Sequence, residues 1–182
     1  MKNVKIFEQI RLRAMIDYDH YRVMRDNAEQ MADKAFRMSK GLLSEFYEKE
    51  FHTWCERKRE YQKLMEREKP FTKEKWYMTE FLYSDAHAYE VVEVYSRDKM
   101  DVRRLNATEK PEAKEARLAS FIPGGFCGNF DNSLQDWTFE SDEKQPILTV
   151  RRHKDGKFYR PNTRTCSFVP QTEPYEWYDF NF

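Results

Sequence analysis

The character of the chain changes at Pro70. Before it, residues 4–68 contain no proline and a single glycine, Gly41, and are rich in Glu, Lys, Arg, Met, Leu and Ala, which favour helix. From Thr79 onward, apolar and polar residues alternate in runs rich in Val and Tyr, which is typical of strands. The switch predicts an α+β protein. Its expected parts are a helical arm at 1–69, an anchored linker at 70–78 and a small β-domain at 79–182.

Apolar residues recur at a spacing of three and four along the first part of the arm, which places them on one side of a helix. The members of this seam, of which Asp17 is the only charged one, are Phe7, Ile10, Ala14, Asp17, Tyr21, Met24, Ala28, Met31, Ala35, Met38 and Leu42. The stripe changes phase at Gly41, which favours two helices, about 4–40 and 43–68, folded as a hairpin. One long helix with a stutter, paired in a coiled coil with a second copy, is the alternative.

The same seam is the predicted self-association surface, so we expect the protein to be a homo-oligomer. The residues assigned to this role are Phe7, Ile10, Tyr21, Met24, Met31 and Met38. The linker carries three aromatic residues that would be costly to leave in water, and we expect them to anchor it. They are Phe71, Trp76 and Tyr77.

Two hairpins organise the predicted β-domain. The first joins a Val-rich strand, in which Tyr89, Val91 and Glu93 alternate with Glu90, Val92 and Val94, to a return strand through a turn at 96–99. The second turns at Asp155-Gly156, a strong two-residue signal. We expect a compact antiparallel barrel of about five to six strands, similar in size to SH3-like barrels, or a strongly bent sheet.

Three further segments complete the β-domain. Residues 106–120 form a charged insertion, either a short helix after Pro111 or a solvated loop, which looks dispensable to the core. The glycine-rich run 121–130 predicts a tight bend under aromatic cover more than a phosphate loop, because no helix is expected to follow it. The aromatic run Tyr175–Phe182 is expected to be the last strand.

Basic residues gather around the second hairpin. The chain has 32 basic and 32 acidic residues, so attraction to a polyanion has to come from a local patch. Arg160 and Arg164 follow this hairpin in the sequence. The predicted binding residues are Arg103, Arg104, Arg151, Arg152, Lys154 and Lys157, with Phe158 and Tyr159 for stacking. Phosphate, nucleic acid or an acidic protein surface would suit such a patch, and a solvated charged face is the simpler interpretation.

The sequence gives little support to catalysis. Asp85 and His87, two residues apart, would point to the same side of a strand, and an Asp-His pair can orient a general base. The same residues fit a turn in which Asp85 caps backbone N–H groups and His87 packs. The three cysteines, Cys55, Cys127 and Cys166, and the four histidines lack metal-ligand spacing, so we expect free thiols, no metal and no cofactor.

Three motifs resemble a family of small uncharacterised proteins encoded by tailed bacteriophages and prophages. Over residues 79–182, the family's elements are a Ser-Asp-x-His-Ala segment, an Ile-Pro-Gly-Gly-Phe turn and a terminal Tyr-Asp-x-x-Phe. The matching residues are Ser84, Asp85, His87 and Ala88, then Ile122 to Phe126, then Tyr178, Asp179 and Phe182. The resemblance implies a phage setting and a small β-domain, but it brings no known activity.

These observations predict a non-enzymatic phage accessory protein that self-associates through its arm. Its β-domain is expected to bind a macromolecular partner, either a virion component or a host defence protein. A nucleic-acid-binding regulator that uses the hairpin at 147–160 is the alternative, and a small hydrolase centred on Asp85 and His87 is a second one. No apolar run resembles a signal peptide or a membrane span, so we expect the host cytoplasm or the virion as its location and no secretion.

Overall fold

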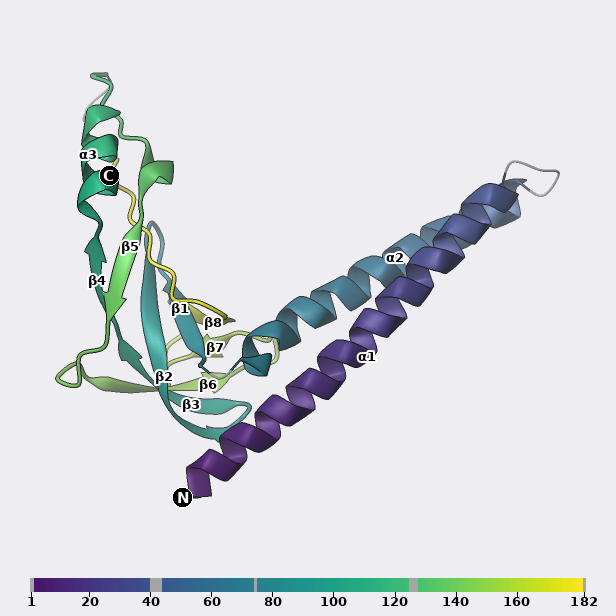
Figure 1. Ribbon diagram of the computed structural model, residues 1–182, viewed down its shortest axis with the longest axis horizontal. Helices are drawn as coiled ribbons and strands as arrows, with labels where there is room; N and C mark the ends of the chain where they lie inside the picture. Colours follow the sequence, from purple (N-terminus) through teal and green to yellow (C-terminus); the bar gives the residue numbers. More distant parts are fainter. Residues whose placement is uncertain (1, 40–43, 74, 125–127, 182) are drawn as a thin grey trace. The chain divides into compact units, whose positions relative to one another are not determined.

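The computed structural model describes residues 2–39, 44–73, 75–124 and 128–181 (Figure 1). The chain divides into two compact units. One comprises Glu8–Glu74, and the other comprises Lys75–Phe182 together with the first seven residues. The first is a pair of helices and the second is built around a β-barrel, so the predicted α+β class is confirmed.

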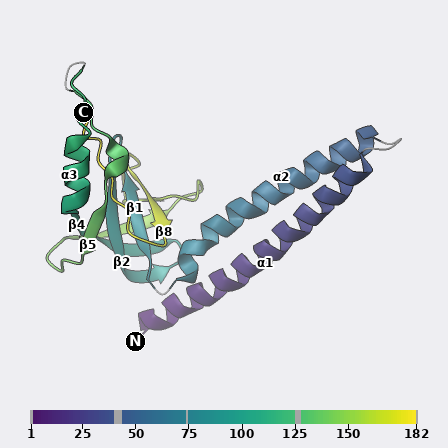
Figure 2. The same cartoon turned by 45° about the horizontal axis from the view of Figure 1, so that its top comes forward.

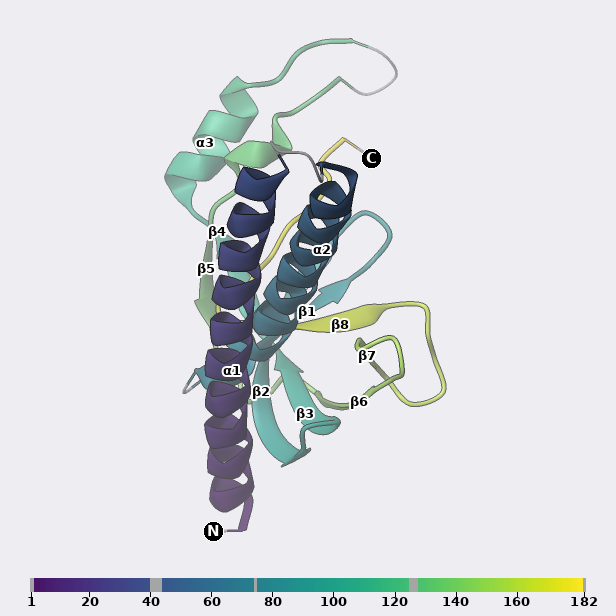
Figure 3. The same cartoon turned by 90° about the vertical axis from the view of Figure 1, so that its right-hand side faces the viewer.

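The arm is a helical hairpin. Helix α1 covers Lys2–Met38, helix α2 covers Ser44–Glu68, and a 3-10 turn at Lys69–Thr72 contains Pro70 and follows α2 directly. Figure 3 shows the two helices running side by side in opposite directions. The hairpin is therefore the correct one of the two predicted arrangements. Gly41, at which the phase of the stripe changes, lies outside the described residues.

Part of the predicted seam is buried within the arm. Its alanines are covered, and so is Ala32, which the predicted seam does not include. The buried alanines of α1 are Ala14, Ala28, Ala32 and Ala35. Phe36 contacts Phe51 of α2, with 5.6 Å between ring centroids, and Lys58 forms an ion pair of 2.5 Å with Glu29.

The proposed self-association residues are placed unevenly on this hairpin. Ile10, Tyr21 and Met24 are half-buried, whereas Met31 and Met38 remain 40% and 43% exposed. The side chain of Phe7 lies outside the described residues.

Six antiparallel strands close into a barrel in the order β1-β2-β3-β6-β7-β8, with β8 hydrogen-bonded to β1. The strands are β1 Tyr77–Phe81, β2 Ala86–Ser96, β3 Lys99–Arg104, β6 Ile147–Arg152, β7 Phe158–Tyr159 and β8 Ser167–Gln171. Their inward side chains form a dry apolar core, because successive residues of a strand point to opposite faces. Its fully buried members are Met78, Ala88, Met100, Val102, Val150, Phe158 and Phe168.

Both predicted hairpins are present, and the pairing of β2 with β3 changes register twice, between Val91 and Glu93 and between Val94 and Ser96. Pairing between β2 and β3 shifts after Val91, so that Val92 is an extra residue in a bulge. Val92 is consequently 42% exposed while Val94 is 4% exposed, although simple alternation places both on one face. Strand β8 was not predicted, because Pro170 lies inside it and proline normally argues against a paired strand.

Between β3 and β6 the chain leaves the barrel and forms an insertion lobe, residues 106–146. Strands β4 Asn106–Glu109 and β5 Trp137–Glu140 form a two-stranded sheet, and helix α3 covers Pro111–Ala119. A 3-10 turn lies at Asn132–Leu134. Figure 2 shows α3 beside this sheet. The helical alternative for residues 106–120 is correct, with Pro111 in the first turn, where its missing N–H costs nothing.

The C-terminal segment is not the strand that its aromatic residues predict. Among the described residues of this segment, only Trp177 forms a β-bridge, with Ala86 at the start of β2, and the segment ends in a turn at Phe180 and Asn181. This segment, yellow in Figure 1, runs from the barrel along β5 toward α3. Its aromatic side chains are used in another way: Tyr178 packs against Trp137, with 5.3 Å between ring centroids, and Phe180 lies under Arg117.

Candidate functional site

Two of the predicted binding residues are engaged in ion pairs within the β-domain. The Nε of Arg103 donates to Glu90 at 2.8 Å, and its Nη2 donates to the hydroxyl of Ser141. Arg104 donates through Nη1 and Nη2 to both carboxylate oxygens of Glu176, whose side chain is fully buried. Both arginines therefore stabilise the fold.

The hairpin residues divide between surface and interior. Phe158 is fully buried in the barrel, so its ring cannot stack on a ligand. Arg152 is also mostly covered, with 15% of its side chain exposed, and its Nη1 lies 3.8 Å from Asp98. Of the predicted binding residues in the hairpin, Arg151, Lys154 and Lys157 are exposed to solvent and Tyr159 is half-buried.

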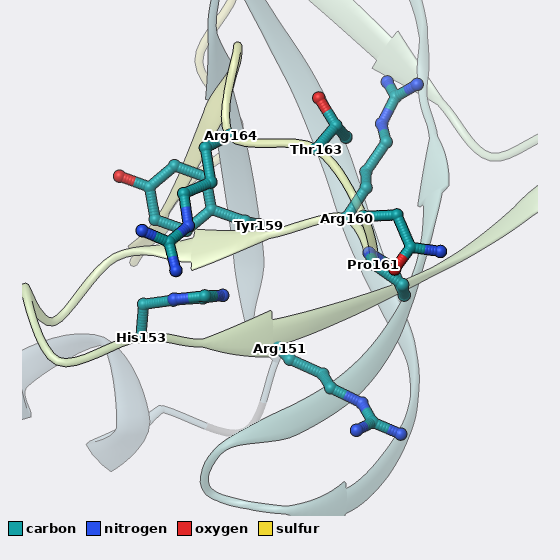
Figure 4. Close-up of a pocket in the computed structure, with 8 residues that line it drawn as sticks. Arg151, His153, Tyr159, Arg160, Pro161, Thr163 and Arg164 are labelled. Atoms are coloured by element: carbon teal, nitrogen blue, oxygen red, sulfur yellow. The ribbon is translucent and has the colours of Figure 1, made fainter.

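A cavity of about 350 Å³ lies over β6, β7 and the loop that follows them (Figure 4). We call it the basic cavity. Its lining residues are Arg151, His153, Tyr159, Arg160, Pro161, Asn162, Thr163 and Arg164. None of them is acidic, although the chain as a whole has as many acidic as basic residues. The local excess of positive charge predicted for this hairpin therefore coincides with a concave surface.

The turn between β6 and β7 fixes Tyr159 in this cavity. Gly156 adopts a positive φ of 83°, which a side chain would disfavour. Asp155 accepts hydrogen bonds from the Tyr159 hydroxyl at 2.6 Å and from the backbone N–H of Lys157 at 3.0 Å. These donors hold the pKa of Asp155 below its usual value, so its charge is retained. His153 meets the Tyr159 ring edge-on, with 5.1 Å between centroids.

Two arginines of the basic cavity have donors to spare. Within the described ranges, no carboxylate or carbonyl oxygen accepts a hydrogen bond from Arg151 or Arg164. In Figure 4, Arg164 lies across Tyr159 toward His153, while Arg151 extends from the neighbouring strand, where it pairs with Tyr159. Guanidinium groups with free donors are suited to phosphate groups, and the Tyr159 ring beside Arg164 is suited to a stacked base.

A second cavity, of about 340 Å³, lies on the other side of Arg160, and we call it the Glu80 cavity. Its lining residues are Glu80, Leu82, His87, Tyr89, Arg160, Thr163, Thr165 and Cys166. The side chain of Glu80 is 3% exposed, and its two oxygens accept hydrogen bonds from Tyr89 at 2.7 Å and from Arg160 at 2.6 Å. Burial and the bond to Glu80 raise the pKa of Tyr89, which keeps its hydroxyl a donor.

Asp85 and His87 have separate partners. Asp85 accepts a hydrogen bond from the backbone N–H of Asp179 at 3.1 Å, so it caps the C-terminal segment. The His87 ring packs against Tyr178, with 5.6 Å between centroids. Burial lowers the pKa of His87, and the positive charge of Arg104 lowers it further. This geometry resembles the predicted turn more than a catalytic dyad.

Sequence reasoning missed Glu80 as a site residue. Its partner Arg160 is 80 positions away, and only closure of the barrel brings β1 beside the loop that carries it. The one available signal was the position of Glu80, a charged residue that faces inward on a strand. Such a residue is seldom buried without a partner, so it indicates a buried ion pair.

The chain matches no protein-family model, no curated protein and no solved structure. Within the described ranges, no helix combines the length and the apolar character needed to cross a bilayer. The same residues include no group of three or more His, Cys, Asp or Glu side chains placed to hold a metal ion.

Proposed function

We propose that this protein binds single-stranded nucleic acid through the basic cavity. One observation carries the proposal: three arginines, a histidine and Tyr159 line the cavity, and no acidic residue lines it. Phosphate contacts by Arg151 and Arg164 would supply most of the affinity, because they release counterions from the strand. Stacking on Tyr159 would add a contribution that depends little on sequence.

Lys154 and Lys157 extend the positive surface next to this cavity. Lys154 lines a neighbouring depression with His153, Asp155, Tyr159 and Arg164, and both lysines are exposed. Lys154 and Arg164 outnumber the single carboxylate of Asp155 there, so the positive surface continues beyond one phosphate site, as a strand with several phosphates requires. Nucleic-acid binding also fits the phage setting that the three sequence motifs imply.

The test is the salt dependence of binding to a fluorescent single-stranded oligonucleotide. The double variant Arg151→Ala/Arg164→Ala should bind more weakly and lower the slope of log K against log salt by about 1.4, since each lost phosphate contact contributes about 0.7. The matched control is Lys114→Ala/Lys144→Ala, which removes two exposed cations from the insertion lobe and should leave the slope unchanged. Absence of binding by the native protein at low salt, or an unchanged slope in the arginine variant, would contradict the proposal.

A second candidate function, self-association through the arm, is favoured by exposed apolar side chains on α1. Leu12, Ile16 and Val23 are 51%, 62% and 53% exposed, and their spacing places them on the side of the helix opposite Ala14 and Ala28. Light scattering coupled to size exclusion tests it. We expect a dimer or larger species for the native chain and a monomer for Ile16→Glu/Val23→Glu, and a monomeric native chain would rule it out.

A further inference from the structure

We propose that the Glu80 cavity receives one unpaired guanine base of the strand whose phosphates occupy the basic cavity. The inference rests on the proposed function, because the strand is the source of the base. Arg160 and Thr163 line both cavities, so the two are adjacent. In Figure 4, Arg160 extends in a different direction from Arg151, which lines only the basic cavity.

The charges of the Glu80 cavity favour a neutral ligand. Glu80 and Arg160 neutralise each other at 2.6 Å. His87 adds no positive charge near neutral pH, because burial lowers its pKa. A second phosphate would therefore find little net attraction here, in contrast to the basic cavity. An uncharged base between Leu82 and the Tyr89 side of the cavity matches these groups better.

Arg160 supplies the preference among bases. A guanidinium carries five N–H donors, and Glu80 accepts one of them from Arg160. Guanine presents two neighbouring acceptors, O6 and N7, which fit an arginine fork, whereas the other purine, adenine, has a donor beside N7. Glu80 fixes the guanidinium in place and so reduces the entropy lost when the base binds.

The size of the cavity limits the ligand to one base. Sites for small ligands range from about 300 to 1,000 Å³. At about 340 Å³, the Glu80 cavity lies near the lower limit. A base pair of a duplex would not enter, so the cavity requires a single strand or an unstacked end.

The thiol of Cys166 can report whether a ligand occupies the Glu80 cavity, because Cys166 lines this cavity and is half-buried. In a Cys55→Ser/Cys127→Ser background, its alkylation rate by iodoacetamide reports on occupancy of the cavity. Two thymine oligonucleotides of equal length serve as probes, one with a central guanine and one with an abasic site at that position. We expect the guanine strand to slow alkylation about tenfold at saturation. The abasic strand should bind about tenfold more weakly and give no protection when saturating.

The outcomes separate this inference from the proposed function. Equal binding of both strands without protection would overturn the base site and leave the basic cavity intact. No binding of either strand would overturn both. Protection by guanosine monophosphate without protection by any strand would overturn the strand as the source of the base.

A filled cavity gives an independent check. Leu82→Trp places an indole in the cavity and should abolish the preference for guanine while leaving the salt slope unchanged. Tyr83→Trp is the matched control, since Tyr83 is its neighbour and is 98% exposed, and it should keep the preference. A guanine preference that survives Leu82→Trp in a folded protein would overturn the inference.

Discussion

The barrel and the insertion lobe are held together by different interactions. The barrel surrounds a core of fully buried apolar side chains such as Met100, Val102 and Phe158. In the lobe, Arg117 is the one buried residue among those that the structure describes. The barrel thus has the burial that drives folding, whereas the lobe depends on polar contacts of defined geometry.

Several of these polar contacts join the lobe to the C-terminal segment. Gln135 exchanges two hydrogen bonds with the backbone of Tyr178, at 2.6 and 2.9 Å. Asn132 donates to Asp179 at 2.7 Å, and Asn181 binds the backbone of Phe130 on both its N–H and its carbonyl oxygen. Side-chain amides can satisfy both donors and acceptors of an extended backbone, so they replace a strand ladder here.

Arg117 joins the same two segments. It donates two hydrogen bonds to Glu109, at 2.9 and 2.7 Å, and its guanidinium lies 3.5 Å from the centroid of the Phe180 ring. The lobe therefore depends on the C-terminal segment for its stability, whereas the barrel is stabilised by its own apolar core.

The largest effect should come from the barrel core. Phe158→Ala removes a fully buried ring and should lower the free energy of unfolding of the β-domain by about 4 kcal/mol. Denaturant titration followed by circular dichroism measures it. The matched control is Leu118→Ala on α3, which is 51% exposed and should change stability by less than about 0.5 kcal/mol. If both variants lowered the free energy of unfolding by similar amounts, the barrel and the lobe would not differ in how burial stabilises them.

A smaller and more local effect should follow from Glu176→Ala. Glu176 pairs with Arg104 and accepts the backbone N–H of Ala88 at 2.8 Å, so its loss leaves a partly buried guanidinium without its carboxylate. Removing one partner of a buried pair costs about 3 kcal/mol. We expect hydrogen exchange to show loss of protection in the lobe and the C-terminal segment, with β3 and β6 still protected.

The control for this change is Glu173→Ala, an exposed carboxylate on the same segment, which should retain native protection. Loss of protection throughout the barrel of Glu176→Ala would show that the two regions fold as one unit.

The same contrast explains what the sequence predicts. The barrel hairpins follow from alternation and from turn signals such as Asp155-Gly156, which are local. The bulge at Val92 was missed because strict alternation does not reveal an extra residue in a strand. The pairing of Pro170 in β8 was missed because its partner Met78 in β1 is distant in the chain. The end of the chain was misassigned because its aromatic residues indicate burial, but its partners are amide side chains about 45 positions away, such as Gln135.

The candidate site shows the same limit. The basic hairpin is visible in the sequence because its charges are neighbours, and Arg151 and Arg164 do line one cavity. The sequence does not show that Arg103 and Arg104 are already paired, since their partners Glu90 and Glu176 are defined only by strand pairing and by the path of the C-terminal segment.

The smallest expected effect is a loss of stability at low pH, where β2 of the barrel meets the C-terminal segment. His87 lies on β2 with its ring against Tyr178 of the C-terminal segment, and burial lowers its pKa. Below the unfolded pKa of about 6.5, the unfolded chain therefore binds more protons than the folded one, so stability falls as the pH is lowered through this window. Above it, His87 makes no such contribution. In His87→Gln this part of the pH dependence should disappear, measured as unfolding free energy between about pH 5 and pH 7.5. Because the imidazolium would form beside Tyr178, hydrogen exchange in acid should rise first in the C-terminal segment. If the unfolding free energies of the native protein and of His87→Gln depended on pH in the same way, His87 would be excluded as the group that titrates.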